Sequence, residues 1–359
     1  MDFGQFNLMG YRDRGTPTHA IYDAAVAQVR AAEQAGFSVS WFAEHHFSNY
    51  CVCPSPLMMI ARMAGETRRI KLGSGVVIVP LYEPARLLAE IGMVDAMTHG
   101  RLVLGVGSGY QPYEFERFGE DLKDSTPKLL EFMEMLEQAV SRETFMYDGQ
   151  HYRLPETHIA PRTFSGGMPD VWVAGDNPEL HKLAARRGYV VMVTPRHYTA
   201  ELLAKARERF AQTYRAVGAD PARMRFGTLR HVCVTDDKAE AAAFLDHIRH
   251  QIRLSQSLRH REQVTDGAML VEKPWPGEMS LDDMARHMLV GSAETIAERM
   301  AAEIRAADPC HYLLQFQAGG SDLATALRSI ERFATGVRPL LEREFGDLSR
   351  IGQPAREAA

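Results

Sequence analysis

Eight short apolar runs alternate with helical periodicity along most of the 359 residues, and this alternation constrains the fold more than any other feature. The run at 70–79 is apolar almost throughout, a pattern typical of a parallel strand covered on both faces. Strand character is found at 3–9, 39–45, 70–79, 101–109, 170–175, 189–194, 224–235 and 311–318. Because crossovers between parallel strands are right-handed, the α/β pattern predicts a single (β/α)8 TIM barrel.

Two stretches lie outside the repeating unit and predict insertions after the fourth and seventh strands. Residues 145–169 begin like a hairpin, with a two-residue turn signal at Asp148-Gly149. Residues 262–290 lose periodicity and contain two prolines and a glycine at 274–277, and a connection of this length is usually functional or mobile. We therefore expect one barrel domain over residues 1–348 and a C-terminal tail at 349–359.

Composition excludes several classes of protein. The chain is 45% hydrophobic and 24% charged, as in ordinary soluble domains, and a net charge of −5 offers no attraction for nucleic acid or an anionic membrane. Residues 1–20 lack the pattern of a signal peptide and no stretch is apolar enough to span a bilayer, so we expect a cytoplasmic protein. The four cysteines are too scattered for a disulfide framework, and Cys51 and Cys53 lack zinc-ligand spacing, so no metal site is expected.

The segment Trp41-Phe-Ala-Glu-His-His-Phe47 places His45 and His46 at the carboxyl end of the second strand. That end of a parallel barrel carries the chemistry of barrel enzymes. Side chains alternate along a strand, so the two histidines are expected to point in opposite directions and cannot easily share a metal ion. One imidazole would then face the barrel mouth and could exchange a proton near neutral pH. The alternative is that both histidines only satisfy structural hydrogen bonds.

Glycines at two strand ends indicate a close approach of the backbone to a ligand. The run 105–109 (Gly-Val-Gly-Ser-Gly) and Gly75 lack Cβ atoms that would hold a flat ring or a phosphate away. A dinucleotide fingerprint would need Gly or Ala at position 110 and an immediate helix, but Tyr110-Gln-Pro follows. A tight turn at the barrel top is the alternative interpretation.

A further candidate lies at Gly175-Asp176-Asn177, directly before Pro178. Asp176 or Asn177 is expected to cap the following helix. A helix N-terminus at the barrel mouth can also bind a phosphate.

Taken together, these stretches resemble the bacterial luciferase-like family of flavin-dependent monooxygenases, especially its alkanal-monooxygenase α-subunit type. The resemblance spans almost the whole chain and is carried by residues 41–47, 72–86, 100–119, 167–174, 184–188 and 290–294. It implies a barrel that binds reduced FMN at its C-terminal mouth and uses O2 to oxidise a small organic substrate, with an aldehyde as the first expectation. A separate flavin reductase would supply the reduced FMN, because no nicotinamide-binding domain is evident. The alternatives are an NAD(P)H- or F420-dependent oxidoreductase on the same barrel, or a flavin-binding member without catalysis.

The resemblance also implies roles for individual residues. His45 matches the family's catalytic proton donor and acceptor, with His46 beside it. Gly75-Val76 falls where the family has a non-prolyl cis peptide against the flavin. Gly107 replaces a reactive cysteine of the light-emitting members, and Ser108 replaces an arginine near the flavin phosphate. The residues expected to bind the cofactor are Gly75, Val76, Gly107, Ser108, Gly109, Tyr110, Ala174, Gly175, Asp176 and Asn177.

Three further expectations follow from the resemblance. Asp176 would repel a phosphate, so Ser108 and the backbone around Tyr110 and Asn177 are the expected phosphate contacts, and the sequence identifies no balancing cation. Segment 262–290 matches a mobile lid that excludes water. A homodimer through the second and third helices is implied, and the alternative is that their apolar residues face the barrel. Those residues are Met58, Met59, Met63, Leu87, Leu88 and Ile91.

Overall fold

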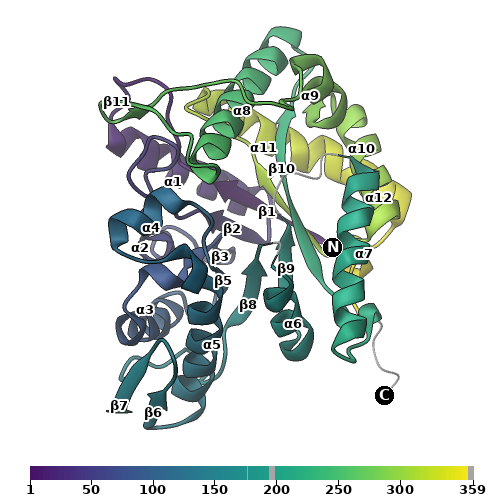
Figure 1. The fold of residues 1–359 in the computed structure, drawn as a ribbon. Coiled ribbons are helices and arrows are strands. Elements are labelled where there is room, and N and C mark those ends of the chain that lie inside the picture. The colour runs from purple at the N-terminus through teal and green to yellow at the C-terminus, as the bar shows by residue number, and fades with distance from the viewer. Residues whose placement is uncertain (176, 194–198, 355–359) are drawn as a thin grey trace.

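The computed structural model describes residues 1–175, 177–193 and 199–354. Within these ranges, eight parallel strands form a closed barrel inside a layer of helices (Figure 1). The barrel closes because the last strand pairs with the first: Tyr312 lies opposite Phe3. The predicted (β/α)8 fold is therefore confirmed. The barrel strands are β1 (Asp2–Asn7), β2 (Val39–Phe42), β3 (Lys71–Ser74), β5 (Leu102–Gly107), β8 (Asp170–Ala174), β9 (Val190–Val193), β10 (Phe226–Val234) and β14 (His311–Gln315).

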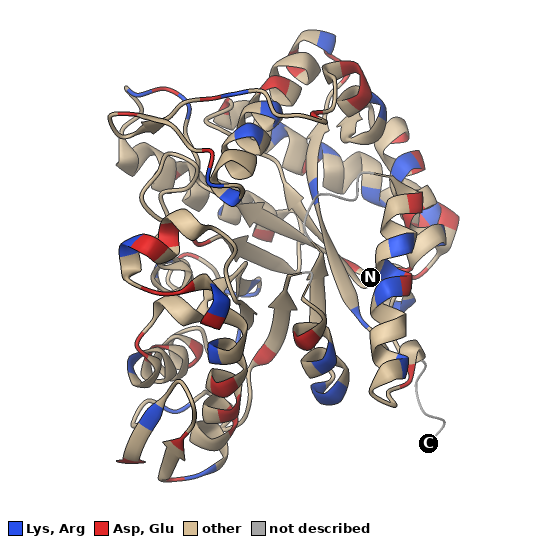
Figure 2. Cartoon of the chain, viewed as in Figure 1, with Lys and Arg blue, Asp and Glu red and all other residues tan. Residues whose placement is uncertain are grey.

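Helices follow the strands and carry most of the charged side chains, whereas the strands carry few (Figure 2). Their ends follow ordinary capping chemistry: α6 starts after Asn177, whose side chain accepts a hydrogen bond from the Glu179 N–H, and it ends at Gly188 in the left-handed conformation. The helices are α1 (Thr18–Gln34), α2 (Pro56–Ala64), α3 (Pro84–Met97), α4 (Pro112–Phe118), α5 (Ser125–Ser141), α6 (Pro178–Arg187), α7 (Ala200–Ala216), α8 (Lys238–Arg259), α9 (Leu281–His287), α10 (Ala293–Ala307), α11 (Leu323–Arg332) and α12 (Arg338–Phe345).

Two tryptophans fill the lower part of the barrel. The rings of Trp41 and Trp172 lie 4.9 Å apart, and His311 packs against both. Glycines at inward positions of other strands make room for them, because a Cβ on Gly73 would lie 2.3 Å from Trp41 and one on Gly227 would lie 2.7 Å from Trp172. These rings fill the barrel interior at this level, and barrel enzymes bind their ligands at the carboxyl ends of the strands.

The predicted hairpin at 145–169 consists of β6 (Phe145–Asp148) and β7 (Arg153–Thr157). Its loop is longer than a two-residue turn, because the pairing joins Asp148 to Arg153 and leaves residues 149–152 between them. Glu131 of α5 stabilises this loop by accepting hydrogen bonds from the N–H groups of residues 150–152. The hairpin connects α5 to β8 and lies far from α8 and α9 (Figure 1).

Segment 262–290 contains more regular structure than its sequence indicates. It forms the short pair β11 (Thr265–Asp266) and β12 (Met269–Leu270), then α9, and then β13 (Leu289–Gly291). β13 extends the barrel sheet by pairing with the end of β10. No helix in the described part of the chain is long and apolar enough to cross a membrane.

The apolar residues expected to form a dimer surface on α2 and α3 mostly face the core. Met63, Leu87, Leu88 and Ile91 are all at most 2% exposed, whereas Met58 is 73% exposed. The prediction that these four residues form a dimer surface was therefore wrong, because they lie on the buried faces of two amphipathic helices.

Candidate active site

A cavity of about 1080 Å³ lies at the carboxyl ends of the barrel strands. Its lower wall consists of inward-facing residues, such as Phe6, Ala43 and Leu313. Each follows a residue at the level of the two tryptophans by two positions along the chain, and so faces the same way one layer higher. The cavity brings together most of the residues that the sequence singled out. These are His45, Gly75, Val76, Gly107, Ser108, Gly109, Tyr110, Ala174, Gly175 and Asn177. Asp176 lies outside the described residues, and His46 does not line the cavity.

Two glycines, Gly75 just after β3 and Gly107 at the end of β5, form part of one wall of the cavity. The peptide bond between Gly75 and Val76 is cis, as the resemblance implies. A Cβ on Gly107 would lie 2.7 Å from the Val76 side chain, and one on Gly75 would lie 3.0 Å from the Phe6 ring. A larger residue at either position would therefore press on a neighbouring side chain of this wall, so the glycines leave room for the close approach of a ligand such as a planar ring.

His45 lines the cavity just beyond the end of β2, and a buried carboxylate determines its tautomer. Its Nδ1 lies 3.0 Å from Oε1 of Glu114, which is fully buried and also accepts the backbone N–H of His46 at 2.8 Å. Because the carboxylate oxygen accepts, Nδ1 carries the proton. No described residue bonds to Nε2, which leaves that nitrogen as the one able to take or give a proton in the cavity.

A chain of polar contacts connects His45 to helix α8. Gln111 Nε2 lies 3.1 Å from His45 Nδ1, a contact between two donors while Nδ1 carries the proton, and it donates to the Tyr110 hydroxyl at 3.2 Å. The Tyr110 hydroxyl lies 3.4 Å from the hydroxyl of Ser255 on α8. Tyr50 packs against the His45 ring, and burial raises the pKa of Tyr50 well above its ordinary value. Tyr50 therefore stays protonated and uncharged near His45.

His46 lies outside the cavity lining and is held by contacts with Glu44 and Phe118, which corrects the expectation that it is catalytic. Its Nε2 lies 3.0 Å from Oε1 of Glu44, and its ring packs edge-on against Phe118. The other Glu44 oxygen accepts from the Ile78 N–H and the Tyr82 hydroxyl, and burial raises the pKa of Glu44. The alternation of side chains thus correctly predicts that only one of the two histidines faces the barrel mouth.

The sequence-based interpretation missed the short helix α4, which carries Glu114. The available signal was Pro112, since proline is favoured in the first turn of a helix. Gln111 directly precedes that proline, and its side chain lies next to the His45 ring. Their role depends on contacts across 66 to 69 residues, which no local pattern reveals.

Among the described residues, two cationic side chains line the cavity, although the sequence identified none. The Arg259 guanidinium lies over the Tyr110 ring, 4.2 Å from its centroid. Lys123, two residues before the start of α5, also lines the cavity and pairs with Asp121 at 2.8 Å. Arg259 therefore places positive charge beside the loop that contains Ser108 and Gly109.

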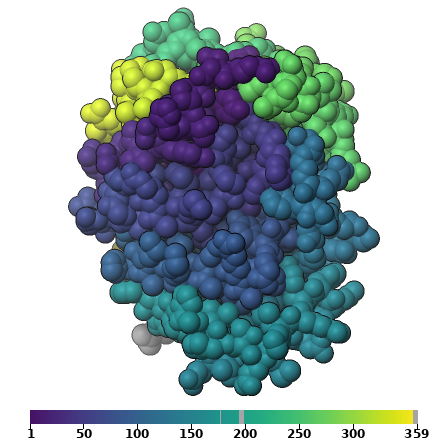
Figure 3. All heavy atoms as spheres, turned by 90° about the vertical axis from the view of Figure 1, so that its left-hand side faces the viewer, coloured from purple at the N-terminus to yellow at the C-terminus, as the bar shows by residue number. Residues whose placement is uncertain are grey.

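Helix α8 covers the cavity in place of the expected lid. Its residues Gln251, Ser255 and Arg259 line the cavity, whereas no residue of 262–290 does. Instead, that segment lies beside the N-terminal residues (Figure 3). The assignment of 262–290 as a mobile lid stays a prediction, and any such movement would act on the cavity through α8.

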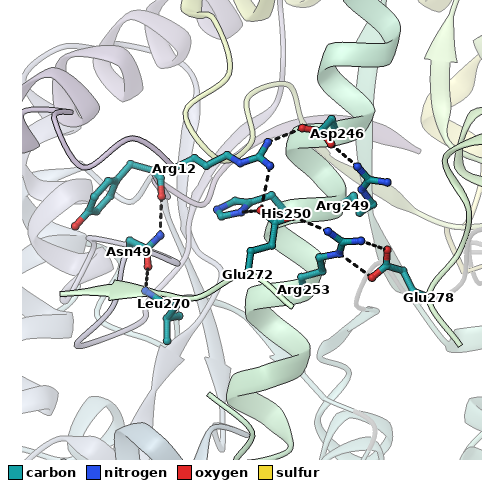
Figure 4. Close-up of polar contacts among 10 residues, drawn as sticks. Arg12, Asn49, Asp246, Arg249, His250, Arg253, Leu270, Glu272 and Glu278 are labelled. Carbon is teal, nitrogen blue, oxygen red and sulfur yellow. Dashed lines mark hydrogen bonds and ion pairs between the residues drawn. The ribbon is translucent and has the colours of Figure 1, made fainter. Parts of the chain in front are cut away.

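Glu272 holds segment 262–290 in place through a network of ion pairs (Figure 4). Its carboxylate contacts Arg12 at 3.0 Å, Arg253 at 2.9 Å and His250 at 2.9 Å. Burial opposes the charge, but the hydrogen bonds from His250 and Arg253 keep the pKa of Glu272 below its ordinary value. The segment is thereby fixed to α8 and to the loop after β1.

The described residues contain no group of three His, Cys, Asp or Glu side chains placed to hold a metal ion. The four cysteines, all described, are free and buried. Burial raises the pKa of Cys51 and of Cys310 to about 12, so these thiols are unreactive at neutral pH.

Comparison with known proteins identifies the family. The family model for luciferase-like monooxygenases matches residues 1–308. The chain belongs to this family. It is 36% identical to the uncharacterized protein y4vJ of Sinorhizobium fredii, over 96% of this chain and 99% of the relative. It is also 30% identical to the oxygenase component of flavin-dependent trigonelline monooxygenase of Acinetobacter baylyi, over 62% of this chain and 61% of that protein.

Solved structures share the barrel of this luciferase-like family member. The oxygenating constituent of 3,6-diketocamphane monooxygenase from Pseudomonas putida, solved with FMN, has a TM-score of 0.75 at 22% identity and covers 94% of this chain and 98% of that one. The F420-dependent tetrahydromethanopterin reductase of Methanopyrus kandleri has a TM-score of 0.70 at 16% identity, with coverage of 94% and 98%. At these identities the likeness shows the fold alone.

Proposed function

We propose that this luciferase-like protein is the oxygenase component of a two-component system. It would bind reduced FMN supplied by a separate reductase and use O2 to oxidise a small, mostly apolar organic molecule, with an aldehyde as the first class to test. One observation carries the proposal: His45 and the wall at Gly75, Val76 and Gly107 border the same cavity. That arrangement places a proton-exchanging group beside a site suited to a planar ring.

The cavity fits FMN in size and in the character of its walls. Its volume of about 1080 Å³ leaves room for a substrate beside the cofactor. The ring would lie against Gly75, Val76, Gly107 and Ala174. Gly109, Gly175 and Asp176 complete the proposed cofactor site.

The phosphate of FMN would lie among Ser108 and the backbone of Tyr110 and Asn177. The Asn177 side chain is already engaged, because it caps α6 and donates to Thr126 at 2.8 Å. Asn177 would therefore contribute backbone groups. Arg259 is the cation that we propose for balancing the phosphate charge, with Lys123 as a second contributor.

In this proposal, reduced FMN supplies the electrons that activate O2, and the protein controls protons and water. His45 Nε2 holds or moves a proton, while Glu114 acts as a positioning residue behind Nδ1. Apolar side chains such as Phe6, Leu8 and Met192 keep water away from the reacting atoms.

The name of the trigonelline enzyme, an oxygenase component, supports a separate flavin reductase as partner. A homodimer and a cytoplasmic location complete the proposal. The exposed methionines Met58, Met93 and Met97 on α2 and α3 are candidates for the dimer surface. Sedimentation equilibrium of the full chain tests the dimer.

The test of function supplies chemically reduced FMN and octanal to the purified protein in the presence of O2. We expect one octanoic acid, one water and one oxidised FMN per O2 consumed. The variant His45→Ala should release hydrogen peroxide in place of the acid, whereas the exposed control His19→Ala should behave as the wild type. Direct oxidation of NAD(P)H by the chain alone, or activity only with reduced F420, would contradict the proposal and favour the alternative oxidoreductase. Equal acid formation by His45→Ala would remove His45 from the mechanism.

A further inference from the structure

The wall formed by β10 and β14 contributes polar side chains to the cavity. His231 of β10 lies opposite Gln315 of β14, and both line the cavity. Leu229 and Leu313, two residues earlier on the same strands, also face each other and line it. The alternation of side chains thus directs His231 and Gln315 inward, above an apolar layer.

An amide pair fixes the tautomer of His231. Gln315 Nε2 donates to Gln251 Oε1 at 2.8 Å and to the Gln317 carbonyl at 2.9 Å, so both its hydrogens are used. Gln315 Oε1 accepts from Gln251 Nε2 at 3.1 Å and lies 3.1 Å from His231 Nδ1. An oxygen can only accept, so Nδ1 of His231 carries the proton and Nε2 carries a lone pair.

Among the described residues, the lone pair on Nε2 has no partner. His231 is 2% exposed, and Nε2 is a buried atom without a hydrogen bond. Burial lowers the pKa of His231 to about 4, so the ring is neutral at physiological pH and Nε2 is available as an acceptor. Buried polar atoms without partners are rare in proteins, and each needs an explanation.

His311 shows what a purely structural histidine in this barrel looks like. It also faces inward, one layer lower, but both its ring nitrogens have partners. Its Nε2 lies 3.0 Å from the Trp41 indole N–H, and its Nδ1 contacts Asp2. His231 differs in two respects. Only its Nδ1 has a hydrogen-bond partner among the described residues, and the residue lines the cavity.

We propose that Nε2 of His231 accepts a hydrogen bond from a neutral O–H or N–H group of the substrate. The inference deepens the proposed function, on which it rests, by adding a feature of the substrate. A simple aldehyde would not use this acceptor, because its carbonyl oxygen is itself an acceptor. The substrate is therefore an apolar molecule that carries a hydroxyl or N–H group in addition to the group that is oxidised.

The test compares two probes of equal size that differ in one donor. Octan-1-ol and 1-methoxyheptane have the same atoms, but only the alcohol can donate a hydrogen bond. Binding to FMN-loaded protein is measured from the flavin absorbance change. We expect the wild type to bind the alcohol about three- to tenfold more tightly, as a net gain of one hydrogen bond implies. His231→Phe should abolish this preference, and His231→Gln, which retains an acceptor, should keep part of it.

The affinity for FMN, measured in parallel, separates this inference from the proposed function. A lost preference in His231→Phe with FMN affinity unchanged within about twofold supports the inference. Equal binding of alcohol and ether by the wild type, binding of neither, or an undiminished preference in His231→Phe would overturn it. If FMN does not bind, the proposed function fails, and the same comparison on the protein alone still decides the role of His231. If His231→Phe does not fold, the graded loss in His231→Gln decides.

Discussion

Replacing Glu114 tests the support of His45 without knowledge of the substrate. Oε1 of Glu114 accepts two buried donors, Nδ1–H of His45 and the backbone N–H of His46. Glu114→Ala leaves both without an acceptor, and each buried unsatisfied donor costs about 1–3 kcal/mol. We therefore expect the free energy of unfolding to fall by about 2–6 kcal/mol. Glu114→Gln retains an oxygen acceptor for both donors and should lose less stability than Glu114→Ala.

The assay is urea unfolding followed by tryptophan fluorescence, combined with nitrogen NMR of histidine-labelled protein. The matched control is Glu116→Ala on the same helix, whose 55% exposed carboxylate makes only a 3.4 Å contact with Arg261. This control should change stability by at most about 0.5 kcal/mol. In the wild type, His45 should be protonated on Nδ1 when neutral, and Glu114→Ala should allow the other tautomer. A Glu114→Ala protein as stable as the control, with the His45 tautomer unchanged, would refute the reasoning.

Three further outcomes are expected. Gly107→Ala should weaken FMN binding at least about tenfold and should cost less stability than Gly105→Ala, since its Cβ meets the Val76 side chain, whereas the Cβ of Gly105→Ala would lie 1.9 Å from a backbone oxygen; titrations with FMN and urea distinguish the two. The pKa of His231 is about 4 in the folded protein and 6.5 ordinarily, so the unfolded chain takes up a proton on this histidine at a higher pH than the folded protein does. The free energy of unfolding therefore decreases as the pH falls below 6.5. From pH 6.5 to 5, the wild type should lose about 2 kcal/mol more than His231→Phe in urea unfolding. Glu272→Gln should speed proteolysis within 262–280, whereas the exposed Asp266→Asn should not.

The barrel was predictable because its signals are local. Apolar runs at even spacing require a parallel sheet covered by helices, and those runs are visible without any tertiary contact. Gly75 and Gly107 were also visible, since a missing side chain at a strand end is a local property. The alternation of side chains predicted that one of the two histidines faces the barrel mouth, and the resemblance identified it as His45.

Other parts of the site depend on contacts between distant residues. Glu114 reaches His45 across 69 residues, and His231 meets Gln315 across 84. Segment 262–290 resembles a loop because it contains Pro274, Pro276 and Gly277, but its anchor is the pairing of Glu272 with Arg12 across 260 residues. Composition can indicate that a segment is irregular, but not which surface holds it.

The most direct test of the account is a crystal structure of the protein with bound FMN. We expect the isoalloxazine ring to lie against Gly75, Val76 and Gly107, with His45 Nε2 within hydrogen-bonding distance of the ring or of a water on its surface. The phosphate should lie near Ser108 and Arg259. A ring bound outside this cavity, or one that contacts the glycines with His45 directed away from it, would contradict the account.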